Sequence, residues 1–146
     1  MKPFTHILVA TDFEKASQRA LEVAIEIARK FDAPLTLLHV YDIPTYSYYA
    51  GPWPTELAAS VEKAARATLS ESLAAAQKAL PTVDSVLCLG DISQQILAQI
   101  SRTGANLLVI GTHGRRGLSH AILGSVAEKM VRMSPVPVLT VQAPEA

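Results

Sequence analysis

The chain alternates short apolar runs with longer segments in which apolar residues recur at helical spacing. The runs are rich in leucine or β-branched residues, and most are continuous rather than alternating, which is typical of strands buried on both faces of a parallel sheet. Amphipathic segments separate them. The five predicted strands are His6–Ala10, Leu35–Val40, Ser85–Leu89, Leu107–Ile110 and Val136–Val141.

The four amphipathic segments predict helices over Glu14–Phe31, Thr55–Leu80, Ile92–Thr103 and Gly124–Met133. Gly104 follows the third helix, as expected of a residue that ends a helix in a left-handed conformation. The second helix, at roughly 1.5 Å per residue, is longer than a sheet of such strands needs. The apolar stripe of the first helix is predicted to be Ala20, Val23, Ala24, Ile27, Ala28 and Phe31.

Alternation of strands and helices predicts an α/β fold, a three-layer doubly wound sheet of five parallel strands with four helices. We expect one domain over residues 1–146. Ligands of such sheets bind beyond the carboxyl ends of the strands, where the strand order reverses. The residues that follow Ala10, Val40, Leu89 and Ile110 are therefore the places to search for chemistry.

Composition narrows the class of protein. Thirteen Lys and Arg balance thirteen Asp and Glu, so the formal net charge is zero and nucleic acid is not an expected partner. No apolar run approaches the ~20 residues that span a bilayer, and the first residues lack the pattern of a secretory signal. The single Cys88 cannot form an internal disulfide. We expect a cytoplasmic location and no membrane association.

A glycine-rich loop follows the fourth strand, with Gly111, Gly114 and Gly117 around Arg115 and Arg116. The next helix opens with Gly-Ser. Glycines allow successive backbone N–H groups to converge on a phosphate, and a helix N-terminus adds free N–H groups and a positive dipole end. The alternative is that the glycines only make tight turns. Neither a P-loop signature nor a G-x-G-x-x-G after the first strand is present, which argues against P-loop NTPases and nicotinamide dehydrogenases.

Asp12 follows the first strand, at the expected reversal of strand order. Its carboxylate can accept hydrogen bonds from a ribose or adenine, or hold a divalent ion such as Mg²⁺ or Mn²⁺ beside phosphates. The alternative is that Asp12 caps the first helix.

Gly111, Gly114, Gly124 and Ser125 fit the pattern G-x2-G-x9-G-S/T, and the whole chain resembles the universal stress protein family. The resemblance implies a Rossmann-like, adenine nucleotide alpha hydrolase-like fold and membership of an ATP-binding subclass. The ligand it implies is ATP, or AMP or ADP, with Mg²⁺ or Mn²⁺ beside it. The implied nucleotide contacts are Ala10, Thr11, Asp12, Val40, Gly111, Thr112, His113, Gly114, Arg115, Arg116, Gly117, Gly124, Ser125, Val126 and Ala127.

We assign no catalytic residue. His113 and His120 have no recognisable nucleophile or carboxylate partner at catalytic spacing, and the ring of His39 is expected to be satisfied within the fold. Cys88 is interpreted as a small core residue. The loop after the second strand carries four aromatic residues that can cover an adenine, pack on the second helix or meet a partner: Tyr46, Tyr48, Tyr49 and Trp53.

Pro135 and Pro137 favour an edge position for the strand Val136–Val141. A homodimer that pairs this strand with its copy would bury the edge, and the family resemblance implies such dimers. Three functions stay open. The first is a stress-response regulator that binds an adenine nucleotide and acts through conformation or partners; the second is a slow ATPase or phosphotransferase; the third is a dimeric interaction module without a ligand.

Overall fold

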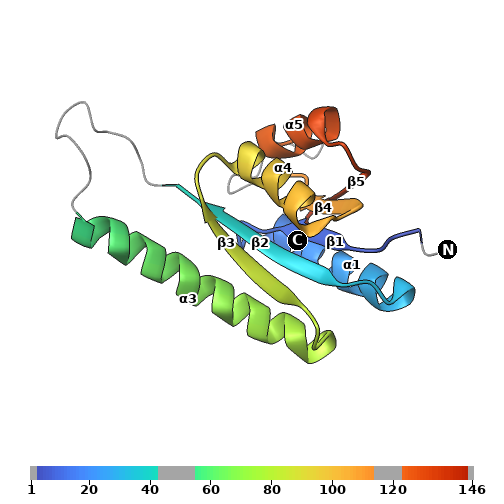
Figure 1. Cartoon of the computed structure of the whole chain (residues 1–146), viewed down its shortest axis with the longest axis horizontal. Coiled ribbons are helices and arrows are strands. Elements are labelled where there is room, and N and C mark those ends of the chain that lie inside the picture. Colours follow the sequence, from blue (N-terminus) through green and yellow to red (C-terminus); the bar gives the residue numbers. More distant parts are fainter. Residues whose placement is uncertain (1–2, 43–54, 114–122, 145–146) are drawn as a thin grey trace.

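The computed structural model describes residues 3–42, 55–113 and 123–144. Within these ranges, five parallel strands form one sheet in the order β3-β2-β1-β4-β5, and four helices cover it (Figure 1). The predicted α/β fold, a doubly wound parallel sheet in three layers, is thereby confirmed. The strands are β1 (Ile7–Ala10), β2 (Leu35–Tyr41), β3 (Asp84–Leu89), β4 (Leu107–Gly111) and β5 (Val138–Val141); the helices are α1 (Lys15–Phe31), α3 (Thr55–Ala79), α4 (Ile92–Thr103) and α5 (Ser125–Met133).

Two separate apolar cores explain why the strands are continuously apolar. Ile7 and Val9 of β1 belong to the core beneath α1 and α3, whereas Leu8 between them belongs to the core beneath α4 and α5. All three side chains are fully buried. Because successive side chains of a strand point to opposite faces, a strand covered on both sides has no side chain that faces water, and its residues are mostly apolar.

The apolar stripe predicted for α1 was incomplete. Ile27 and Phe31 are partly buried and pack against the core, and Val23 is only partly buried, whereas Leu21 and Ile25, which the prediction left out, are buried. The reason is that α1 packs on α3 as well as on the sheet, so its buried arc turns toward α3. The interpretation of Cys88 as a small core residue holds in part, since its half-buried side chain packs from the edge strand β3 against the core beneath α4 and α5.

The last strand lies at the edge of the sheet, as its prolines predicted. It begins at Val138 rather than Val136, because Pro137 has no N–H to donate and contributes only its carbonyl, which accepts a bond from the Leu108 N–H at 2.9 Å. In the described ranges, no helix combines the length and the apolar character needed to cross a membrane.

The connections that follow the central strands β1 and β4 lead to opposite faces of the sheet. The chain leaves β1 for α1 on one face of the sheet and leaves β4 for α5 on the other face (Figure 1). The connections that follow the two strands therefore diverge, which opens a crevice at the carboxyl edge between them.

Candidate ligand-binding site

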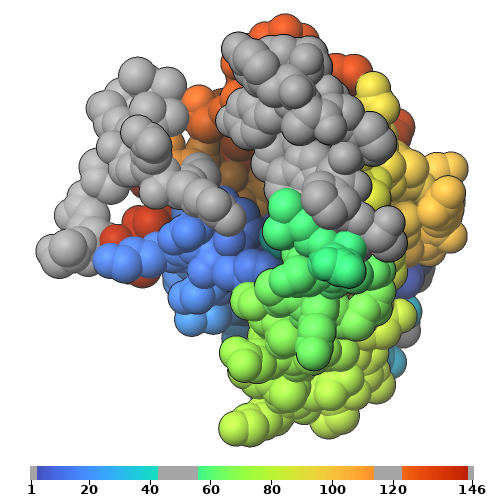
Figure 2. Space-filling view, turned by 90° about the vertical axis from the view of Figure 1, so that its left-hand side faces the viewer, coloured from blue at the N-terminus to red at the C-terminus, as the bar shows by residue number. Residues whose placement is uncertain are grey.

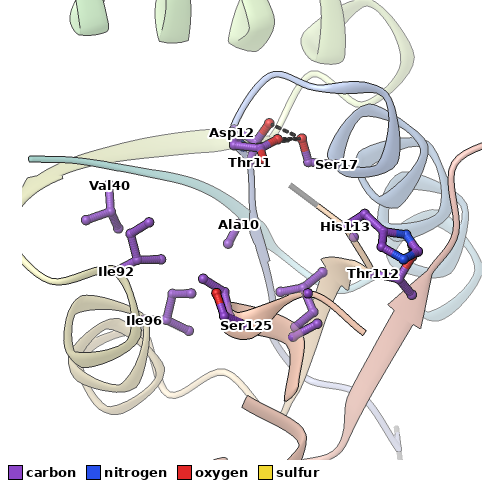
Figure 3. Close-up of a pocket in the computed structure, with 15 residues that line it drawn as sticks. Ala10, Thr11, Asp12, Ser17, Val40, Ile92, Ile96, Thr112, His113 and Ser125 are labelled. Atoms are coloured by element: carbon purple, nitrogen blue, oxygen red, sulfur yellow. Dashed lines mark hydrogen bonds between the residues drawn. The ribbon is translucent and has the colours of Figure 1, made fainter. Parts of the chain in front are cut away.

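A cavity occupies the crevice between the ends of β1 and β4. Figure 2 looks onto this edge of the molecule, where blue residues of the N-terminal part of the chain lie beside the green helix α3. Residues from both strand ends, from β2 and from the first turns of α1, α4 and α5 meet in it (Figure 3). The described lining residues are Ala10, Thr11, Asp12, Ser17, Val40, Ile92, Ile96, Ile110, Gly111, Thr112, His113, Gly124, Ser125, Val126 and Ala127.

One side of the cavity is apolar. Ile92 and Ile96 project from α4 toward Val40 at the end of β2 (Figure 3), and Ala10 and Ile110 come from the two central strands. Ile96 is fully buried, whereas Ile92 is 42% exposed at the mouth. A wall of aliphatic side chains without charged groups fits the flat face of an aromatic base.

The N-terminus of α5 forms another part of the lining. The backbone N–H groups of Ser125, Val126 and Ala127 form no hydrogen bond with any described residue, as expected for the first turn of a helix. The N–H of Gly124 is not free in this sense, because it donates to the Thr112 carbonyl at 2.6 Å. Three unpaired donors at the positive end of a helix dipole make this turn suited to an anion.

Gly111 lies at the closest approach between β4 and α1. A Cβ atom there would lie 2.8 Å from both the carbonyl carbon and the Cβ of Ala16, and 2.9 Å from the Ser17 nitrogen. Such contacts with backbone atoms are shorter than real Cβ atoms show. The need for glycine at this position therefore follows from helix packing, a reason that the interpretation of the loop as a phosphate cradle did not include.

Asp12 lies in the turn between β1 and α1. Its Oδ1 accepts hydrogen bonds from the Glu14 N–H at 2.9 Å and from the Ser17 hydroxyl at 2.6 Å. The bond to Glu14 closes a turn before the helix and is not the helix cap that the alternative interpretation predicted, because the N-cap residue of α1 is Glu14 and no side chain caps it. Asp12 also lines the cavity, and in the described ranges its Oδ2 has no hydrogen-bond partner.

The two described histidines of this region differ in surroundings. His39 is satisfied within the fold, as predicted: its Nδ1 lies 2.7 Å from the Thr11 carbonyl, and its ring packs on Phe13 at 4.3 Å between centroids. His113 lines the cavity, with its Nδ1 3.0 Å from the Thr112 hydroxyl.

Tyr41 ends β2 next to Val40, at the same edge of the sheet. Burial raises the pKa of its phenol, and the negative charge of Glu62 adds to this shift while Arg66 opposes it. The phenol of Tyr41 therefore stays neutral to a higher pH than that of an ordinary tyrosine.

Some of the predicted ligand contacts lie outside the described residues: Gly114, Arg115, Arg116 and Gly117. The same holds for His120 and for the aromatic residues Tyr46, Tyr48, Tyr49 and Trp53. The other predicted contacts, from Ala10, Thr11, Asp12 and Val40 to the residues around Gly111 and Ser125, line one cavity.

The sequence interpretation missed four lining residues, namely Ser17, Ile92, Ile96 and Ile110. Ile92 had a usable signal, because it begins a helix directly after a strand end. Ser17 had none, since a serine in the first turn of a helix is an ordinary feature.

Comparison with known proteins gives a consistent result. The model of the universal stress protein family matches residues 3–142. The universal stress protein YxiE of Bacillus subtilis is 28% identical over 147 residues, which cover 95% of this chain and 99% of that protein. A universal stress protein from Thermus aquaticus is 32% identical over 139 residues, covering 95% and 99% of the two chains.

Solved structures share the fold. The universal stress protein UspA from Lactobacillus plantarum has a TM-score of 0.77 at 23% identity, with 94% and 97% of the two chains covered. A universal stress protein in complex with cAMP has a TM-score of 0.68 at 24% identity, covering 94% and 96%. A protein of this family from Arabidopsis thaliana, with AMP bound, has a TM-score of 0.66 at 23% identity, covering 96% and 92%.

Proposed function

The chain belongs to the universal stress protein family, and from that premise we propose that it is a stress-response regulator whose cavity binds an adenine nucleotide, ATP in the first place. The observation that carries the proposal is the pairing of two surfaces. Aliphatic side chains line part of the cavity, and three N–H groups of α5 that donate to no described residue line another part. A base and a phosphate need these two surfaces at the two ends of one ligand.

Two structural neighbours support an adenine nucleotide in particular, since one was solved with cAMP and another with AMP. In the proposed complex the base lies against Ile92 and Ile96, with the backbone of Val40 at its edge. The phosphates lie on the first turn of α5, and Gly114, Arg115, Arg116 and Gly117 remain contacts predicted from the sequence.

Asp12 is the only carboxylate among the described lining residues. Its Oδ2 can accept a hydrogen bond from a ribose hydroxyl, or it can ligate an Mg²⁺ or Mn²⁺ ion that accompanies the phosphates. These ions prefer oxygen ligands such as carboxylates and phosphates. One carboxylate oxygen with phosphate oxygens fits an ion that arrives with the nucleotide, so the ion belongs to the ligand in this proposal.

The proposed activity is binding that changes conformation or partner choice rather than turnover. Phosphoryl transfer needs a group that orients water or accepts a proton as well as the metal ion. Asp12 is the one acidic candidate, and its Oδ1 is already engaged by Glu14 and Ser17. Phosphate release measured with Mg²⁺ and Mn²⁺ tests the alternative of a slow ATPase.

The proposed assembly is a homodimer through the C-terminal strand Val136–Val141. Strand β5 is an edge of the sheet, and Leu139 on it is 36% exposed. Val131 and Met133 of α5 are also exposed near this edge. A cytoplasmic location remains a prediction from the sequence, which cell fractionation tests.

The test of the binding site uses proline to remove one N–H group. Ser125 is the first residue of α5, a position at which proline is tolerated, and the preceding Gly124 already has the extended conformation (φ −63°, ψ 162°) that proline requires of its neighbour. Ser125→Pro should therefore leave the helix intact and remove one donor to the phosphate. Loss of a hydrogen bond to a charged group predicts affinity for AMP lower by about tenfold to a hundredfold in calorimetric titration.

Two controls accompany this variant. Ser125→Ala removes only the hydroxyl and should retain most of the affinity. Adenosine has no phosphate, so its affinity should be equal for Ser125→Pro and the unchanged protein. Absence of binding by ATP, ADP, AMP and cAMP would refute the proposed function, whereas equal AMP affinity of the proline variant would place the phosphate away from α5.

A further inference from the structure

The hydroxyl of Ser17 holds Asp12 at two points. It donates to the Asp12 carboxylate Oδ1 at 2.6 Å (Figure 3). It also accepts from the Asp12 backbone N–H at 3.2 Å. Side chain and backbone of Asp12 are thereby tied to one atom on the first turn of α1. With Oδ1 fixed in this way, Oδ2 is the carboxylate oxygen left for a ligand.

Ser17 is itself part of a buried pair of hydroxyl groups. Thr11 Oγ1 donates to Ser17 Oγ at 3.1 Å and accepts from the Phe13 N–H at 2.9 Å. Only 4% of Ser17 and 7% of Thr11 are exposed. A hydroxyl whose hydrogen bonds are all used within the protein is suited to hold a neighbouring group rather than to exchange partners with solvent.

The turn that these bonds hold is strained. Phe13 has φ 67°, in the left-handed region, which costs a residue other than glycine about 1–3 kcal/mol. The His39 ring packs on Phe13 and its Nδ1 bonds the Thr11 carbonyl, so the turn is also supported from β2. A strained turn keeps its conformation only while its supports are present, and Ser17 is the support that touches Asp12.

We propose that Ser17 is a positioning residue for ligand binding, which acts by fixing the rotamer of Asp12 so that its Oδ2 faces the cavity. This inference rests on the proposed function, because it assigns Ser17 to the same site. Ser17 acts through Asp12 and not through contact with the nucleotide. Its loss therefore weakens binding only while Asp12 is present.

A double-mutant cycle tests this dependence. Ser17→Ala is expected to lower the affinity for AMP about tenfold, the size of coupling common between residues in contact. In a protein that already carries Asp12→Ala, the same substitution should cause no further loss. Gln18→Ala is the matched control, since Gln18 bonds the Phe13 carbonyl of the same turn at 3.0 Å without touching Asp12. It should leave the affinity unchanged.

A measurement without ligand separates this proposal from the proposed function. Scalar couplings in NMR should report one χ1 rotamer of Asp12 in the unchanged protein and an average of rotamers in Ser17→Ala. An unchanged single rotamer would overturn the positioning role even if nucleotides bind. An equal loss of affinity with and without Asp12 would also overturn it, because Ser17 would then contact the ligand or support the fold in general. If the rotamer changes but no adenine nucleotide binds the unchanged protein, the proposed function fails and the role of Ser17 in binding fails with it.

Discussion

Replacement of Gly111 by alanine tests the packing of α1 against the end of β4. The added Cβ would lie 2.8 Å from two atoms of Ala16 and 2.9 Å from the Ser17 nitrogen, where ordinary contacts begin at 3.4 Å. The first turn of α1 must therefore move by about half an ångström. Ala16 is 3% exposed and two of the three atoms belong to the backbone, so rotation of a side chain cannot relieve the contact.

Overpacking of this kind costs about 1–3 kcal/mol. At about 2–4 °C per kcal/mol for a domain of this size, Gly111→Ala should lower the melting temperature by several degrees. The displaced residues include Ser17, which holds Asp12, so the affinity for adenine nucleotides should fall as well. Denaturant unfolding followed by circular dichroism measures the first effect, and calorimetric titration measures the second.

Gly104→Ala is the matched control. Nothing lies within 4 Å of a Cβ at Gly104, but its φ of 71° makes alanine strained by about 1–2 kcal/mol. It should lower stability to a similar extent and leave nucleotide affinity unchanged. Equal denaturation midpoints for Gly111→Ala and the unchanged protein would refute the reasoning, because α1 would then not approach β4 as closely as the distances require.

Three further predictions concern the cavity wall, the sheet edge and the end of β2. Ile92→Asp places a charge at the exposed mouth of the cavity, so it should lower the affinities for adenosine and AMP about equally in titration, without loss of thermal stability. Unaltered affinities would show that the base does not bind against Ile92. Leu139→Lys should convert a dimer to a monomer in light scattering, and a monomeric unchanged protein would contradict the proposed assembly. The raised pKa of Tyr41 stabilises the fold fully below about pH 10, and this contribution is lost as pH rises through the raised value, so Tyr41→Phe should unfold at higher pH in an alkaline titration.

The sequence was sufficient for the fold because its signals are local. Continuous apolar runs such as Leu107–Ile110 belong to strands covered on both faces, and Gly104 ends its helix in the left-handed conformation that its position predicted. The packing of one element on another was harder to predict from the sequence. The burial of Leu21 and Ile25 depends on α3 lying beside α1, and no periodicity within α1 contains that fact.

Some residues of the site could likewise be predicted from the sequence, and others could not. Asp12 and the residues after Ile110 could be placed in one crevice because the ends of parallel strands meet at one edge. Ile96, one turn further into α4, could not, because its place depends on the order of the strands, which brings α4 beside β1 and β2. Ser17 was missed for another reason: its role lies in a hydrogen bond across the turn, and hydrogen-bond partners are set by three-dimensional distances rather than by spacing along the chain.

Gly111 and Ser125 belong to one sequence pattern but meet two separate physical demands. Glycine at position 111 is required wherever α1 packs this closely on β4, with or without a ligand. The N–H groups that follow Gly124 have no such structural use, because no described residue accepts from them. Gly111 is therefore weak evidence for a nucleotide, and the unpaired donors of α5 are the stronger evidence. For this reason the decisive variant for binding is the one that removes a donor at Ser125, while the variant at Gly111 reports on packing first.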